Sequence, residues 1–194
     1  MKRALANYLA HPDERVATGN LIALVLAWNT PFYPLYLRWA AGAQAWPWGL
    51  LTLCVLPLFL AAPPLGRRHP IGGRLLLAVV GFGNIVFCTW LLGAPSGTEL
   101  FLMPCVLLPG LLFRRSEWPA LLPLIAAPPA AYYLLHDHYP PPPVAWTPDA
   151  SAHLFALSAG SAGCLTGFFA LLVSRPSPTP PGPRGVPGSA SSAR

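Results

Sequence analysis

The chain has 194 residues, of which 54% are apolar and only 9% are charged, and its formal net charge is +6. Soluble domains carry about 25% charged residues, so this composition excludes an ordinary water-soluble fold. Nucleic acid is not expected as a partner, because no basic stripe interleaved with aromatic residues occurs in the chain. The basic residues instead act as topology signals that face anionic headgroups, which makes the lipid bilayer the expected partner.

The first part of the chain predicts a short surface segment and two membrane spans. Residues 1–19 mix basic, acidic and apolar side chains and are expected to lie at the cytoplasmic face of the membrane. The apolar stretches at 20–39 and 45–62 predict two transmembrane helices, since a bilayer is crossed by roughly 20 apolar residues. Pro63 and Pro64 are expected to end the second helix before the basic residues that follow.

A polar turn joins the next two predicted spans, at 71–92 and 98–113. The turn carries one acid, Glu99, and no basic residue, whereas basic residues lie beyond both far ends of the two spans. Cytoplasmic loops carry an excess of Lys and Arg. The hairpin is therefore expected to place its turn outside and its basic ends in the cytoplasm.

The last part of the chain predicts two more spans and a tail. The apolar stretches at 118–135 and 152–173 are the fifth and sixth predicted helices. Residues 174–194 are rich in Pro, Gly and Ser, cannot bury a core, and predict a disordered cytoplasmic tail. Small residues at small-xxx-small spacing predict a packing seam on the sixth helix, and they are Ala156, Gly160, Gly163 and Gly167.

Together these features predict an all-α, polytopic membrane protein with six transmembrane helices and both termini in the cytoplasm. With this topology eleven of the twelve Lys and Arg residues face the cytoplasm, and only Arg38 lies outside. This agreement with the positive-inside rule predicts a multi-pass membrane protein whose basic loops face the cytoplasm.

Three polar residues at or near membrane depth are candidate ligand-binding or signalling residues. Asn84 and, more weakly, Asn29 lie within predicted spans, where a polar group is costly unless it is paired or functional. Interhelical hydrogen bonding is the alternative role for both. Glu99 precedes a span, where the helix dipole stabilises a carboxylate, and a proton or cation site is its alternative role.

The outer histidines offer only a weak metal site, and catalysis has no clear signature. His136, His138 and His153 are weak candidates for metal ligands, but the pattern does not complete a ligand set, so no metal is expected. The same histidines could sense external pH. Ser161 lies eight residues from His153 on one predicted helix, too far for a nucleophile–base pair. No catalytic residue, cofactor or enzyme activity is therefore expected.

Four short motifs carry a resemblance to a known family. They are Arg15 with Asn20, Gly81-Phe82-Gly83-Asn84, Gly97-Thr98-Glu99-Leu100-Phe101 and Leu111-Leu112-Phe113-Arg114-Arg115-Ser116-Glu117. With six spans and cytoplasmic termini, the chain resembles the MASE-like six-helix input domains of bacterial histidine kinases and of adenylate and diguanylate cyclases. The resemblance covers about residues 15–175. It implies a sensor in a bacterial cytoplasmic (inner) membrane that feeds a cytoplasmic catalytic module through a helical linker, whereas only the tail follows in this chain.

The resulting hypothesis is an integral membrane sensory or regulatory protein that lacks its own catalytic module. Arg114, Arg115 and Glu117 are its expected cytoplasmic interface. The expected partner is a cytoplasmic kinase, cyclase or regulator on a separate polypeptide, and a homodimer is a further option. The alternative function is a small transporter or channel subunit that uses Asn84 and Glu99 along its pathway.

Overall fold

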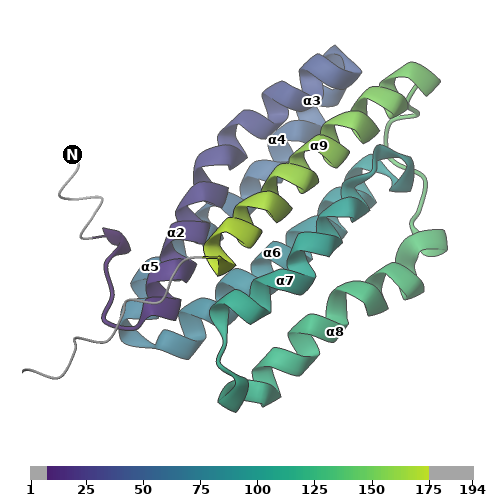
Figure 1. Cartoon of the computed structure of the whole chain (residues 1–194). Helices are drawn as coiled ribbons and strands as arrows, with labels where there is room; N and C mark the ends of the chain where they lie inside the picture. Colours follow the sequence, from purple (N-terminus) through teal and green to yellow (C-terminus); the bar gives the residue numbers. More distant parts are fainter. Residues whose placement is uncertain (1–7, 175–194) are drawn as a thin grey trace, which may run out of the picture.

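The computed structural model describes residues 8–174 and shows a bundle of helices (Figure 1). It contains no β-strand within these residues, which confirms the all-α prediction. The predicted disorder of the tail falls on residues 175–194, and the first seven residues of the predicted surface segment are 1–7, so both lie outside the described part. The α-helices are α2 (Glu14–Asn29), α3 (Tyr33–Ala41), α4 (Trp46–Leu51), α5 (Leu56–Arg68), α6 (Pro70–Leu92), α7 (Leu102–Leu112), α8 (Trp118–Leu135) and α9 (Pro148–Val173).

Short 3-10 turns join several of these helices end to end. They are η1 (Thr30–Phe32), η2 (Ala43–Ala45), η3 (Thr52–Val55), η4 (Ala94–Ser96), η5 (Thr98–Phe101), η6 (Arg115–Glu117) and η7 (His136–His138). In the described residues the joined segments lie at the six positions that the sequence predicts: 14–41, 43–68, 70–92, 98–112, 115–138 and 148–173.

Four of the joined segments contain an apolar stretch long enough to cross a membrane: Ala43–Arg68, Pro70–Leu92, Arg115–His138 and Pro148–Val173. Thr98–Leu112 is a shorter apolar helix. These helices support a multi-pass membrane protein, whereas the number of six spans and the orientation stay predictions. In Arg115–His138 the apolar stretch is α8 itself, and the charged residues lie in η6 and η7, beyond its two ends.

The prediction that Pro63 and Pro64 end the second helix is wrong. Both lie inside α5, which continues to Arg68. Beyond the prolines, α5 packs against α6 where two glycines meet, and a Cβ on Gly73 would lie 2.5 Å from the Gly66 Cα. This close antiparallel packing stabilises the end of α5, although each proline removes one backbone donor.

The predicted seam on α9 does not pack against any other part of residues 8–174. Its four small residues are exposed, and a Cβ added at Gly160, Gly163 or Gly167 would have no neighbour within 4 Å. The face of α9 that packs into the bundle instead carries Ala150, Leu154, Ser158, Ala162, Phe169 and Leu172. The four small residues of the predicted seam therefore lie on the outward face of the helix.

Two apolar clusters hold the bundle together, and α8 lies at its edge. The larger cluster joins α2, α5, α6, α7 and α9, and the smaller one joins α3, η2, α6 and α9. By contrast, α8 stands beside α7 at the margin of the bundle (Figure 1). Much of its surface is exposed and apolar, including Tyr133 at 86% exposure, as expected of a helix that faces lipid.

Candidate functional site

A partly open cavity of about 120 Å³ lies between the helices of the bundle, and both predicted asparagines line it. Asn29, at the end of α2, and Asn84, in the middle of α6, belong to its lining together with Thr98, Phe101 and Phe169. The lining contains no charged side chain. An apolar cavity of about 150 Å³ in another protein binds benzene, so this space suits a small uncharged molecule or part of one.

The three threonine hydroxyl groups of the lining are already used within the protein. Thr30 Oγ1 donates to the Leu26 carbonyl at 2.8 Å, and Thr52 Oγ1 donates to the Gly49 carbonyl at 2.7 Å. Thr98 Oγ1 lies 2.7 Å from Ser96 Oγ.

Asn84 keeps hydrogen-bonding capacity that the threonines have used. In the described residues its side chain has one weak contact, accepted by Oδ1 from Cys88 Sγ at 3.7 Å. The amide nitrogen of Asn84 and the exposed side chain of Asn29 have no protein partner there. Because an amide group offers two donors and an acceptor, these two residues could orient a ligand that carries a carbonyl or hydroxyl group.

Glu99 lies beside the cavity but does not line it. Its neighbour Thr98 belongs to the lining, whereas the Glu99 carboxylate turns toward the end of α8 and pairs with His136. The distance from Oε2 to His136 Nδ1 is 2.6 Å. The structure therefore brings Asn29 and Asn84 together and places Glu99 in a second cluster.

The Glu99–His136 pair joins a buried group to an exposed one. The Glu99 side chain is 7% exposed, and its Oε1 has no hydrogen-bond partner among the described residues. The His136 side chain is 42% exposed, in η7 beyond the end of α8. The hydrogen bond and charge of Glu99 raise the pKa of His136 above its ordinary value, and the charge of Asp137 contributes in the same direction.

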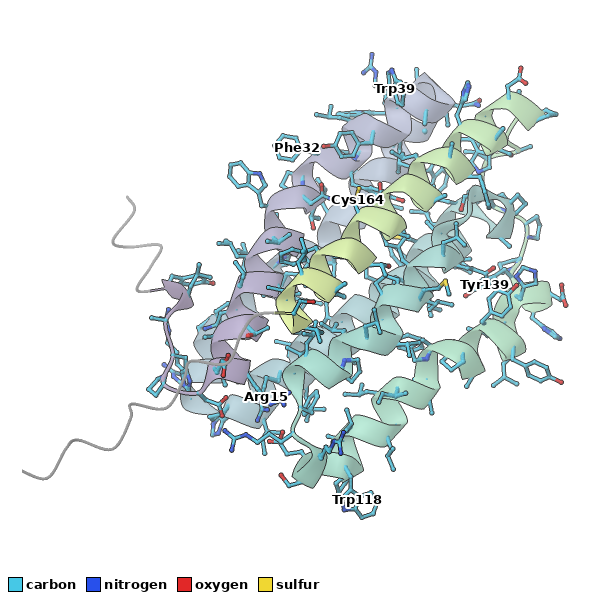
Figure 2. All side chains as sticks on the ribbon, viewed as in Figure 1. Arg15, Phe32, Trp39, Trp118, Tyr139 and Cys164 are labelled. Atoms are coloured by element: carbon cyan, nitrogen blue, oxygen red, sulfur yellow. The ribbon has the colours of Figure 1, made fainter. Side chains whose placement is uncertain are left out.

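The opposite end of the bundle carries the basic residues, and Arg74 is buried among them. Figure 2 shows Arg15 and Trp118 at this basic end, with Trp39 and Tyr139 toward the other. Arg74, only 4% exposed, donates to both carboxylate oxygens of Glu117. That hydrogen bonding with Arg74 is the main cause that lowers the pKa of Glu117, against the effect of burial.

The Arg74–Glu117 pair separates Glu117 from Arg114 and Arg115, the other two residues of the predicted cytoplasmic interface. Glu117 is occupied by Arg74 and by the backbone N–H of Arg114, which donates to it at 2.7 Å. Arg114 and Arg115 are exposed. Arg114 also contacts Asp13, at 3.4 Å, through a side chain that is 61% exposed. The exposed arginines therefore remain available to a partner or to lipid, whereas Glu117 is part of the fold.

The three outer histidines do not assemble a metal site. Between residues 8 and 174, no three His, Cys, Asp or Glu side chains come close enough to hold a metal ion. His136 pairs with Glu99 instead, and His138 and His153 are exposed.

Sequence reasoning missed the pairing of His136 and the burial of Arg74. The burial of Arg74 has a weak sequence signal, because this arginine lies one turn inside α6, past the basic residues that precede that helix. For His136, the predicted topology placed it on the same side as Glu99 but could not show that the two meet. Trp146 Nε1 donates to the Leu92 carbonyl at 2.8 Å, and no sequence pattern predicts this hydrogen bond.

A bundle of apolar helices with its charged groups gathered at the ends is the architecture of a polytopic membrane protein. The chain belongs to the MASE7 family, whose model matches residues 7–172. This match confirms the resemblance to MASE-type membrane sensor domains. No curated protein and no solved structure matches the chain.

Proposed function

We propose that this protein is the sensory input domain of a bacterial signalling system. In this proposal the chain crosses the cytoplasmic membrane six times, with its basic end and both termini in the cytoplasm. A small uncharged molecule occupies the cavity and changes the packing of the helices around it. A kinase, cyclase or regulator reads the change at the basic end, where Arg114 and Arg115 are exposed. The domain itself carries out no catalysis.

The cavity that contains Asn29 and Asn84 is the observation that carries this proposal. Its walls come from α2, α3, α5, α6, α7 and α9 and from the turns η1, η3 and η5, so a bound molecule would contact most of the bundle. A ligand shifts a conformational equilibrium only by its difference in affinity for the two states. A cavity shared by several helices supplies such a difference, because its shape depends on how the helices pack.

The first test is to identify the partner. The full chain would carry a carboxy-terminal tag, be cross-linked mildly in native membranes and be purified for mass spectrometry. Recovery of a kinase, cyclase or regulator is expected, and the double variant Arg114→Gln, Arg115→Gln should reduce that recovery. Recovery of the protein alone would contradict the input role and favour transport.

The second test concerns the cavity. Asn84→Leu should alter the output of the recovered partner, because leucine fills similar space without a hydrogen-bonding group. The variant should still unfold at a temperature near that of the unmodified protein, since the Asn84 side chain makes a single weak hydrogen bond in the part of the chain that the structure describes. Gly83→Ala is the matched control, because a Cβ there meets nothing within 4 Å. An unchanged output in Asn84→Leu would remove this residue from the site.

A small transporter or channel subunit is the second candidate function. The buried carboxylate of Glu99, with one oxygen unpaired among the described residues, is the observation that favours it. Ionisable groups inside membrane proteins often mark ion or proton pathways. This function requires that Glu99→Gln abolish flux through the protein in liposomes. Unaltered flux, or no flux in either form, would count against it.

A further inference from the structure

Two pairs of titratable side chains, Arg74–Glu117 and Glu99–His136, hold the two ends of α8 against the rest of the bundle. At the basic end, Arg74 of α6 binds Glu117 of η6, with Nη2 and Oε1 separated by 2.8 Å. At the other end, Glu99 of η5 binds His136 of η7 at 2.6 Å. In each pair the residue from the bundle is buried, at 4% and 7% exposure, and its partner lies in the turn next to α8. Each end of this peripheral helix is therefore held from inside.

The two pairs respond differently to pH near neutrality. Arginine keeps its charge in proteins, and the pKa of Glu117 is lowered by its hydrogen bonds with Arg74. The Arg74–Glu117 pair is therefore charged on both sides throughout the neutral range. Histidine is the residue whose charge changes in that range, so the Glu99–His136 pair is the one that can gain or lose a charge there.

In the described residues, the Glu99 carboxylate depends on the imidazole of His136 for a compensating charge. Its Oε1 is buried without a partner in the described residues. Burial raises the pKa of Tyr139, and the charge of the nearby Glu99 raises it further. The other groups close to His136 are Asp137 and the ring of Tyr132, whose centroid is 4.8 Å away. No basic side chain besides His136 pairs with Glu99 in the described residues, and a buried carboxylate without a compensating charge is costly.

We propose that the Glu99–His136 pair is a proton site that holds the end of α8 against the bundle when it is protonated and releases that end when the proton leaves. The Arg74–Glu117 pair is then the fixed end about which α8 moves. A metal ion does not fit this place, because no third His, Cys, Asp or Glu joins the pair in residues 8–174. The proposal goes beyond the sensory function above, since it requires no ligand in the cavity.

The direction of the pH effect follows from the pKa of His136, which is raised above 6.5 by its contact with Glu99. A group whose pKa is raised in the folded state contributes its full stabilisation below its ordinary pKa. That contribution is lost as the pH rises through the raised value. The pair should therefore hold α8 at mildly acidic pH and release it at alkaline pH on the side of the membrane that this end faces.

Distances between spin labels at the two ends of α8 test the proposal. The full chain, with its four native cysteines changed to alanine, would carry labels in lipid nanodiscs at two exposed positions, Trp90→Cys on α6 and Tyr133→Cys on α8. A second labelled protein, Ile71→Cys with Leu122→Cys, reports on the basic end. Between about pH 5.5 and about pH 8.5, on either side of the ordinary histidine pKa, the 90–133 distance should lengthen and broaden. The 71–122 distance should stay the same.

Substitutions at the exposed His136 separate this proposal from a general effect of pH on the fold. His136→Arg keeps a positive charge at both pH values and should keep the short 90–133 distance at both. His136→Gln has no titrating group and should show the long, broad distribution at both. Identical distributions in the unsubstituted protein at the two pH values, or a pH response that survives in His136→Gln, would overturn the proposal. Neither result bears on the capture of a partner, which tests the sensory function separately.

Discussion

Arg74 binds Glu117 with two parallel hydrogen bonds, from Nη1 to Oε2 at 3.0 Å and from Nη2 to Oε1 at 2.8 Å. The same guanidinium donates to the Leu112 carbonyl at 2.7 Å and, through Nε, to the Pro70 carbonyl at 2.9 Å. One buried side chain therefore joins α6, the end of α7 and the turn before α8. Arginine suits this place because its rigid fork of donors satisfies several acceptors at once.

Replacement of Arg74 should destabilise the fold strongly. Arg74→Met keeps the length of the side chain but leaves Glu117 without its charged partner and the Leu112 carbonyl without its side-chain donor. Removal of one member of a buried ion pair costs about 3–5 kcal/mol, and a loss near the lower value is expected because Glu117 is 19% exposed. Chemical unfolding in detergent micelles would measure the change in free energy.

The matched control is the exposed pair of Arg114 and Asp13. Arg114→Gln removes a contact of 3.4 Å made by a side chain that is 61% exposed. Exposed pairs contribute about 0–1 kcal/mol, so this variant should unfold almost like the unsubstituted protein. Equal losses in Arg74→Met and Arg114→Gln would show that burial of Arg74 does not determine its contribution.

A methyl group at Gly73 should disrupt the packing of α5 against α6. Its Cβ would lie 2.5 Å from both the Cα and the N of Gly66 and 2.8 Å from the Ala62 carbonyl oxygen, so the backbones must move apart. Gly73→Ala should therefore cost about 1–3 kcal/mol, as overpacking does in other cores. Thermal unfolding in the same detergent would measure the loss.

Gly83 on the same helix is the control for Gly73. A Cβ at Gly83 meets nothing within 4 Å, and alanine is favoured over glycine inside a helix by about 0.5–1 kcal/mol. Gly83→Ala should leave the unfolding temperature unchanged or raise it. If both alanine variants behaved alike, the close approach of α5 and α6 at Gly66 and Gly73 would be wrong.

The positions of the helices could be predicted because their cause is local. Charge-free apolar stretches place α8 at 118–135, the bounds that the structure has, and place α6 within one residue at its start. The end of α5 could not be predicted in this way. Pro63 and Pro64 are local signals for a helix end, but contact between Gly66 and Gly73, on two different helices, overrides them.

The sequence predicts how deep in the membrane the residues of the candidate site lie, but it does not predict which side chains they contact. Hydropathy places Asn29 and Asn84 inside the membrane region, and topology places Glu99 and His136 at one end. Neither pattern fixes the rotation of a helix about its axis, which decides what each side chain faces. That rotation puts both asparagines on one cavity and turns Glu99 away from it, toward His136. It also puts the small residues of α9 on the outward face.

The outward position of these small residues leads to a prediction about α9. Gly160→Ala, Gly163→Ala and Gly167→Ala together should not destabilise the isolated chain, because each added Cβ points into open space. Helix propensity should instead favour the triple variant slightly. Thermal unfolding of the protein diluted in detergent would measure this. A clear loss of stability would mean that the face packs against another part of the chain.

Acid should weaken the basic end of the bundle by protonating Glu117. Hydrogen bonding with Arg74, followed by the backbone N–H of Arg114 and the charges of both arginines, lowers the pKa of Glu117 below its ordinary value of 4.5 in spite of burial. A lowered pKa means that the carboxylate contributes its stabilisation above about pH 4.5 and loses it as the pH falls through the lowered value. The free energy of unfolding should therefore fall between about pH 7 and about pH 3. Part of this fall should be absent in Glu117→Gln, because that variant is already less stable at neutral pH. An identical acid response in the two proteins would show that this pair does not determine it.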